Sequence, residues 1–232
     1  LVHGVMNDHV DDEFIALMRK HSVTYMPTLS AYSHYFELFK NELAFTAFEK
    51  AHGHEEIIGS FDQLMENVAN TDQMFQIFLK YVPLVDAKES ELAKLTAREQ
   101  HIVKQLQAAF STNIETIQKS NLAKMIAAGV NVAFGTDAGN PGTLHAASIM
   151  GELDEWKKAG AKNIDILKAM TFGNAVALQL QNYIGTLAAD MHANFVVLDE
   201  DPTQRLSALA SPYMTVKRGG IGKQNTDNKG TE

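Results

Sequence analysis

Two polar side chains stand directly after short apolar stretches, in positions where a side chain can do chemistry. His3 follows Leu1-Val2, and Asp137 comes after the β-rich residues 130–134. Imidazole nitrogens and carboxylate oxygens bind divalent cations such as zinc, and a carboxylate also accepts protons. The pattern leaves a plainer interpretation open for each: a histidine satisfied by backbone groups, and an aspartate that forms a turn or caps the next helix.

Tyr32 and His145 are candidate substrate-binding residues. Tyr32 lies just beyond a β-rich stretch that ends at Pro27, and His145 is predicted to begin the helix after the Asp137 turn. A plainer interpretation fits each residue equally well: Tyr32 could pack against neighbouring helices, and His145 could be exposed to water at the start of a helix. His52-Gly53-His54 has the spacing of a metal-binding pair, but it falls in a helical region and is interpreted as a solvated loop.

Composition narrows the classes of partner. The 232 residues carry 20 Lys+Arg against 28 Asp+Glu, a net charge of -8, which disfavours binding to nucleic acid or to an anionic membrane. The chain has no cysteine, so a metal must be held by histidine and carboxylate, for which nine histidines are available. No apolar run approaches the about 20 residues of a membrane span. A cytoplasmic and a periplasmic location fit equally well.

These candidate residues need elements to position them, and the pattern predicts strands at residues 1–5, 23–26, 130–134 and 195–198. A helix is predicted after the first strand. Helical patterns also cover residues 31–110, including one amphipathic helix over 86–107, and residues 114–128, 144–159 and 164–180. Gly129 is predicted to cap the helix before it. Alternation of strand and helix predicts parallel βαβ units, whose strands end at one common mouth.

Three parts of the chain resemble one known family. Leu1-Val2-His3-Gly4-Val5, residues 14–18 and Tyr25-Met26-Pro27-Thr28-Leu29 look like the sixth strand, sixth helix and seventh strand of the imidazolonepropionase-like and prolidase-like amidohydrolases. Residues 127–139, with Gly135-Thr136-Asp137-Ala138-Gly139, resemble the family's eighth strand and its aspartate. Residues 169–175, 184–187 and 193–202 resemble its closing helix and return into a small β-sandwich, although Ala189-Asp190-Met191-His192 stands where the family has a Gly-Lys pair.

The resemblance implies an α/β fold: a partial (β/α)8 TIM-type barrel, with a large helical insertion and a C-terminal piece of a small β-sandwich. Residues 1–30 would form barrel strands six and seven, 31–110 a helical insertion or cap, and 111–182 strand eight with the closing helices. Residues 183–222 would belong to the β-sandwich, and 223–232 would be a disordered tail. Because a barrel needs eight strands in roughly 250 residues, we expect that this chain alone does not close one.

The resemblance also implies a divalent metal site, usually of one or two zinc ions. His3 and Asp137 would be ligands, and Asp137 would also accept and pass on a proton. The family's other ligands are a His-x-His pair, a Lys or Glu, and a further His, all of which would precede residue 1. We therefore expect a missing N-terminal segment or a second subunit to supply them. A homo-oligomer is left open.

The leading hypothesis is thus a metal-dependent hydrolase of C–N bonds in small amide, dipeptide-like or cyclic amide substrates, with deamination left open. The alternative is a catalytically silent fragment or a partner subunit that completes another chain. A third hypothesis, a binding module that uses the helical cap, does not explain the Gly-Thr-Asp-Ala-Gly turn.

Overall fold

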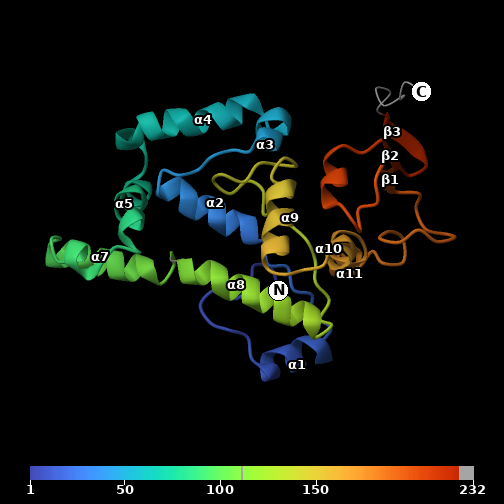
Figure 1. The fold of residues 1–232 in the computed structure, drawn as a ribbon, viewed down its shortest axis with the longest axis horizontal. Coiled ribbons are helices and arrows are strands. Elements are labelled where there is room, and N and C mark those ends of the chain that lie inside the picture. The colour runs from blue at the N-terminus through green and yellow to red at the C-terminus, as the bar shows by residue number, and fades with distance from the viewer. Residues whose placement is uncertain (111, 225–232) are drawn as a thin grey trace.

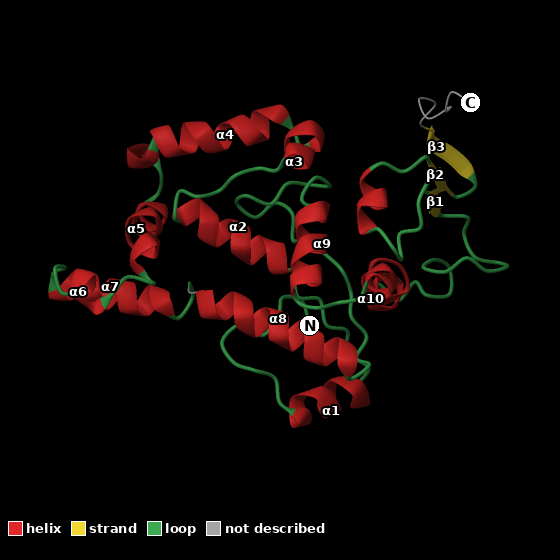
Figure 2. Ribbon diagram, viewed as in Figure 1, coloured by secondary structure: helices red, strands yellow, loops and turns green. Residues whose placement is uncertain are grey.

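Helices form most of the computed structural model, which describes residues 1–110 and 112–224 (Figures 1 and 2). The α-helices are α1 Asp12–Lys20, α2 Leu29–Phe39, α3 Ala47–His52, α4 Glu55–Glu66, α5 Gln73–Tyr81, α6 Glu89–Leu92, α7 Ala97–Gln107, α8 Thr112–Ala127, α9 Ile149–Lys158, α10 Asn163–Lys168 and α11 Asn174–Ala177. Strands β1 Phe195–Val197, β2 Met214–Lys217 and β3 Gly220–Gln224 complete an α/β chain.

Three extended segments lie side by side where the sequence predicts its first strands. Val2 bridges Met26 and Tyr25 bridges Val132, both in parallel orientation. The amide of Met26 donates to the carbonyl of Leu1 at 3.0 Å, and that of Tyr25 donates to Asn131 at 2.9 Å. These are isolated bridges, so the prediction of regular strands here is wrong. A regular ladder needs repeated hydrogen bonds along each strand, and these segments make only a few.

Helices α2, α8 and α9 pack around the main core, with Leu122, Leu153 and Trp156 fully buried. The ring of Trp156 lies 5.5 Å from that of Phe134, which ends the third extended segment. Gly129 ends α8 with a φ of 69°, as predicted. Its amide donates to Ile126 and the next amide donates back to Met125. This cap turns the chain from α8 directly into the extended segment at 130–134.

The region from α2 to α7 is helical, as the sequence predicts, and its aromatic side chains form a second core. The predicted single helix over 86–107 is, however, divided into α6 and α7. Thr96 is the reason: its hydroxyl accepts from the amide of Glu99, and the Glu99 carboxylate accepts from the amide of Thr96. This reciprocal capping box starts a new helix at Ala97.

Two other predicted helices also differ in extent. The helix expected from residue 144 begins only at Ile149, because the Ser148 hydroxyl accepts from the amide of Leu144 and Ala146 has a φ of 61°. His145 therefore lies in a turn before α9. The helix expected over 164–180 consists of α10, a π-helical turn at Ala169–Gly173 and α11, and it ends at Ala177 shortly before Gln179, whose φ is 58°.

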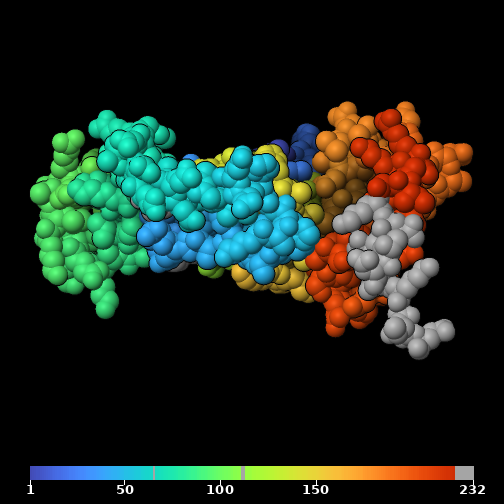
Figure 3. Space-filling model, turned by 90° about the horizontal axis from the view of Figure 1, so that it is seen from above, coloured from blue at the N-terminus to red at the C-terminus, as the bar shows by residue number. Residues whose placement is uncertain are grey.

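The C-terminal strands form an antiparallel sheet in the order β1-β2-β3 at one end of an elongated molecule, opposite α5 to α7 (Figures 1 and 3). Strand β1 confirms the predicted late strand. Lys223 and Gln224, placed in a disordered tail by the sequence, belong to β3, and the rest of that predicted tail is outside the described residues. No helix in the described part of the chain is both long enough and apolar enough to span a membrane.

Candidate functional site

Three polar residues meet where the parallel extended segments end. His3, Thr28 and Asp137 have φ angles of 66°, 50° and 54°, a left-handed conformation that is uncommon outside glycine. The His3 Nδ1 lies 3.0 Å from the Thr28 hydroxyl and 3.7 Å from Asp137 Oδ2. Such backbone conformations persist where the surroundings enforce them, and they cluster at functional sites. The fold thus brings the two residues singled out from the sequence into direct proximity.

Asn140 fixes the orientation of the Asp137 carboxylate. Its side-chain amide donates to Asp137 Oδ2 at 2.6 Å and to the Asp137 carbonyl at 3.0 Å. The backbone amide of Asn140 points to the same carbonyl, at 3.4 Å. Within the turn after residue 134, the side chain of Asn140 therefore restrains one oxygen of the Asp137 carboxylate, Oδ2.

A pocket of about 290 Å³ opens over these residues. Its lining consists of His3, Met6, Thr28, Ala31, Tyr32, Tyr35, Ala109, Phe110, Gln118, Asp137 and Asn140. Of the candidates from the sequence, His3, Tyr32 and Asp137 share this pocket. His145 is exposed, lies in the turn before α9 and is not among the lining residues. His52 and His54 are exposed at the junction of α3 and α4.

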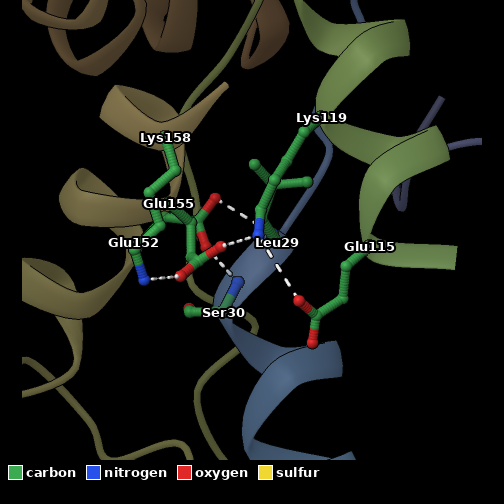
Figure 4. Close-up of polar contacts among 7 residues, drawn as sticks. All are labelled: Leu29, Ser30, Glu115, Lys119, Glu152, Glu155 and Lys158. Carbon is green, nitrogen blue, oxygen red and sulfur yellow. Dashed lines mark hydrogen bonds and ion pairs between the residues drawn. The ribbon is translucent and has the colours of Figure 1, made fainter. Parts of the chain in front are cut away.

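A buried carboxylate from α9 supports the start of α2. The backbone amides of Leu29 and Ser30 donate to Glu152 at 3.0 and 2.7 Å (Figure 4). The indole nitrogen of Trp156 donates to the same carboxylate at 2.8 Å. Burial raises the pKa of Glu152, and these hydrogen bonds oppose the rise. Because Glu152 caps α2, the N-cap residue Thr28 makes no side-chain cap, and its hydroxyl faces His3.

A chain of charges beside Glu152 joins α8 to α9. Lys119 lies 2.8 Å from Glu155 and 3.4 Å from Glu115, and Lys158 lies 2.7 Å from Glu155 (Figure 4). Burial favours the neutral form of Glu155, but the hydrogen bonds from the two lysines outweigh it and hold the pKa of Glu155 below its ordinary value. This network fixes α9, and with it Glu152, relative to the pocket wall formed by α8.

The loop after Asp137 is tied to the helical region by two further contacts. The Ser148 hydroxyl donates to buried Glu49 at 2.7 Å, and His34 lies 3.3 Å from the Thr143 hydroxyl. Burial lowers the pKa of His34, although the charges of Glu49 and Glu155 act in the opposite direction. The helices of residues 31–110 therefore anchor the Asp137 loop as well as lining the pocket.

The donor set fits part of a metal site. Because zinc binds nitrogen and carboxylate oxygen at about 2.0–2.2 Å, two atoms on one ion lie roughly 3–4 Å apart. The 3.7 Å between His3 Nδ1 and Asp137 Oδ2 agrees with this range. A zinc site normally has at least three protein ligands. Among residues 1–110 and 112–224 no group of three or more His, Cys, Asp or Glu side chains is placed to hold a metal ion.

Thr28, Asn140 and Phe110 are pocket residues that the sequence did not single out. Thr28 follows a predicted strand, as His3 does, so its position was a usable signal. Asn140, three residues after Asp137, has the spacing of a turn whose side chains pair. Phe110 gave no signal, because it reaches the pocket only through packing on α2.

Comparison with known proteins identifies relatives of this chain. The model of the amidohydrolase family matches residues 38–222, a stretch that contains Asp137 and begins after His3. No curated protein matches significantly by sequence.

Solved structures give a similar result. The chain resembles a Xaa-Pro dipeptidase with bound methionine in its active site, at a TM-score of 0.53 and 18% identity, over 92% of this chain and 38% of that one. It resembles a prolidase complexed with N-methylphosphonate-L-proline equally well, over 93% and 38%, and a putative prolidase from Bifidobacterium longum at a TM-score of 0.52 and 18% identity, over 94% and 40%. The chain thus spans well under half of the length of these relatives.

Proposed function

The chain belongs to the amidohydrolase family, and on this premise we propose that it contributes to a metal-dependent hydrolase of C–N bonds in small amides, dipeptide-like compounds or cyclic amides. The observation that carries the proposal is the proximity of His3 and Asp137 in one pocket, where the parallel segments end. The prolidase and dipeptidase among the similar structures support a dipeptide-like substrate.

His3 and Asp137 would hold a divalent cation, for which zinc suits the nitrogen and oxygen donors. When bound, such a cation polarises a carbonyl and makes water more acidic. The Thr28 hydroxyl lies 3.0 Å from His3 Nδ1, the same nitrogen that lies 3.7 Å from Asp137 Oδ2, and it thereby restrains the ring beside the carboxylate. Asn140 donates to the same oxygen, Asp137 Oδ2, and restrains it.

Asp137 would move the proton during hydrolysis. Its carboxylate accepts a proton from water as the water oxygen attacks the amide carbon, and it then gives the proton to the leaving nitrogen. Both the side chain of Asp137, 36% exposed, and that of His3, 56% exposed, are open to the pocket. A substrate carbonyl in the pocket would therefore reach both groups without a change in the fold.

We further propose that the three extended segments, which are joined by isolated bridges, occupy the places of strands six to eight in a partial (β/α)8 barrel. Their parallel order supports this, as do the greater lengths of the similar structures. The remaining ligands and strands would come from a preceding segment of a longer chain or from a second subunit. Family membership does not favour the alternative of a catalytically silent chain.

Hydrolysis by the complete protein, supplied with Zn²⁺, tests the assignment. Release of free amino acid from a panel of dipeptides, including Xaa-Pro dipeptides, is measured for the native protein and for Asp137→Asn. We expect the substitution to lower kcat by about 10²- to 10⁴-fold, the usual contribution of a general base. His3→Ala should weaken Zn²⁺ binding measured by calorimetry.

Asp190→Asn is the matched control, because Asp190 is exposed, has a similar φ of 66° and is not part of the pocket lining. It should leave kcat and Zn²⁺ affinity unchanged. Unchanged turnover in Asp137→Asn would remove the role assigned to Asp137.

A further inference from the structure

The pocket over His3 and Asp137 has one polar side and one apolar side. The apolar side is formed by Ala31, Tyr32 and Tyr35 of α2 and by Ala109 and Phe110, which follow α7. The Tyr32 hydroxyl donates to the carbonyl of Ala109 at 3.1 Å. Two segments far apart in the sequence are thereby joined into one surface, which we name the aromatic wall: Tyr32, Tyr35 and Phe110.

Contacts among aromatic rings of the helical region hold the aromatic wall in place. The Phe110 ring lies 6.5 Å from Tyr32 and 6.4 Å from Tyr35, at interplanar angles of 22° and 13°. Phe110 also makes edge-to-face contacts with Phe39 and Phe78, at 5.7 and 5.5 Å. Since these rings pack in the core of the helical region, the wall offers a preformed apolar surface.

The charge of the pocket lining also favours a neutral, apolar group on the ligand. Asp137 is its one carboxylate, and no lysine or arginine among the described residues contributes to it. Without a bound metal ion, a carboxylate on the substrate would therefore find a like charge and no lysine or arginine at this surface, whereas a neutral ring would bury apolar area and stack.

We propose that the aromatic wall determines specificity by selecting substrates that carry a neutral apolar side chain, aromatic ones most strongly, beside the scissile C–N bond. This inference rests on the proposed function for the identity of the bond. The preference itself belongs to the wall, and it does not require a bound metal ion. Phe110 acts by shaping the surface that the substrate side chain contacts.

The test measures binding without catalysis. The protein is kept in excess EDTA, and the dissociation constants of N-acetyl-L-phenylalanine amide, N-acetyl-L-leucine amide, N-acetylglycine amide and N-acetyl-L-aspartic acid amide are measured by calorimetry or by NMR titration. We expect the phenylalanine amide to bind at least about tenfold more tightly than the glycine amide, the range of a filled apolar subsite. The leucine amide should fall between them, and the aspartic acid amide should bind most weakly.

Two substitutions link the preference to the wall. Phe110→Leu should reduce the phenylalanine-to-glycine ratio by about threefold or more, because an aromatic contact is lost. Ala109→Leu projects from an exposed position into the pocket and should reduce the same ratio by occupying the space. Phe45→Leu is the control: it removes a ring that packs against Phe61, outside the pocket and without a contact to the wall, and the ratio should stay within about twofold of native.

Circular dichroism melting identifies any variant that fails to fold. If Phe110→Leu unfolds, Ala109→Leu still tests the proposal. Equal affinity for the phenylalanine and glycine amides, or tighter binding of the aspartic acid amide, would overturn it. A selective wall in a protein that hydrolyses none of the dipeptides would contradict the proposed function alone, whereas hydrolysis without side-chain preference would contradict only the inference.

Discussion

In many helices the side chain of the N-cap residue accepts hydrogen bonds from the first backbone amides. In α2 the N-cap residue is Thr28, but Glu152 supplies this acceptor. The Thr28 hydroxyl faces His3, and the carboxylate of Glu152 accepts the first backbone amides of α2 instead. Glu152 is fully buried, so its loss would leave amide and indole donors without an acceptor in a place that water does not reach. The position of Thr28 at the pocket therefore depends on a residue 124 positions further along the chain.

Replacing Glu152 tests this dependence. We expect Glu152→Ala to lower the free energy of unfolding by about 2–4 kcal/mol, because the buried donors lose their partner. Glu152→Gln keeps one acceptor oxygen and should lose less. Urea unfolding followed by circular dichroism measures both.

Asp154→Ala, an exposed position on the same helix, is the control and should change stability by less than about 0.5 kcal/mol. A Glu152→Ala variant as stable as the control would show that α2 does not need this cap.

Glu99 provides a pH dependence at the residue scale. Hydrogen bonds from the amide and hydroxyl of Thr96 and from Lys80 lower the pKa of Glu99 from 4.5 to about 2. A carboxyl group whose pKa is lower in the folded state stabilises the fold above its unfolded pKa, and this contribution disappears as the pH falls through the folded value. Glu99→Gln should therefore lower Tm at pH 7, and the difference from the native protein should narrow as the pH falls from 4.5 to 2.

The partner substitution supplies the control. In a Thr96→Ala background, Glu99→Gln should have a smaller effect on Tm and a weaker pH dependence, because the hydroxyl donor is gone while the backbone amide of residue 96 and Lys80 remain. A Tm difference that is constant between pH 7 and pH 2 would rule out the capping box as its source.

At the scale of elements, Gly129 sets where α8 stops and the extended segment toward Asp137 begins. A Cβ at this glycine would meet no other atom within 4 Å, so the backbone φ of 69° is the one obstacle to a side chain. We expect Gly129→Ala to destabilise the protein by about 1 kcal/mol, the strain of a left-handed alanine. Thermal or urea unfolding measures the change.

Gly59 is the matched control within a helix. A Cβ there also meets nothing within 4 Å, but Gly59 lies inside α4 and has no positive φ. Gly59→Ala should stabilise the protein by about 0.5–1 kcal/mol through helix propensity. The two substitutions add the same methyl group, so equal signs would contradict the assignment of Gly129 as a left-handed cap.

At the scale of the whole molecule, an open set of three parallel segments leads us to expect association. Phe172, 45% exposed, borders hollows beside residues 129–131, and Leu178 and Leu187 nearby in the chain are 65% and 78% exposed. Uncovered apolar surface and strand edges promote pairing with another chain. This chain by itself should dimerise or aggregate, as light scattering coupled to size-exclusion chromatography would detect.

Substitutions at two separate exposed positions distinguish this surface from non-specific association. Phe172→Asp should shift the population toward monomer, whereas Ile57→Asp, 47% exposed on α4, should not. A soluble native monomer that unfolds cooperatively would count against the partial barrel.

Local patterns in the sequence determined where several elements lie. Apolar stretches that end in a polar residue placed His3 and Asp137 at the ends of extended segments, and helical periodicity identified the region from α2 to α7. Gly129 was recognisable because only a left-handed residue closes a helix in this way. Signals of this kind involve only residues that are close together in the chain, so they can be recognised from the sequence alone.

Tertiary structure alone decided the surroundings of the candidate site. Glu152 caps a helix 123 positions away, and Phe110 reaches the pocket through rings on α2. His145 lies in a turn and not in a helix, because α9 begins only at Ile149. Such contacts join residues that are distant in the chain. No local or periodic pattern around one residue identifies its distant partner, so only the folded structure shows these contacts.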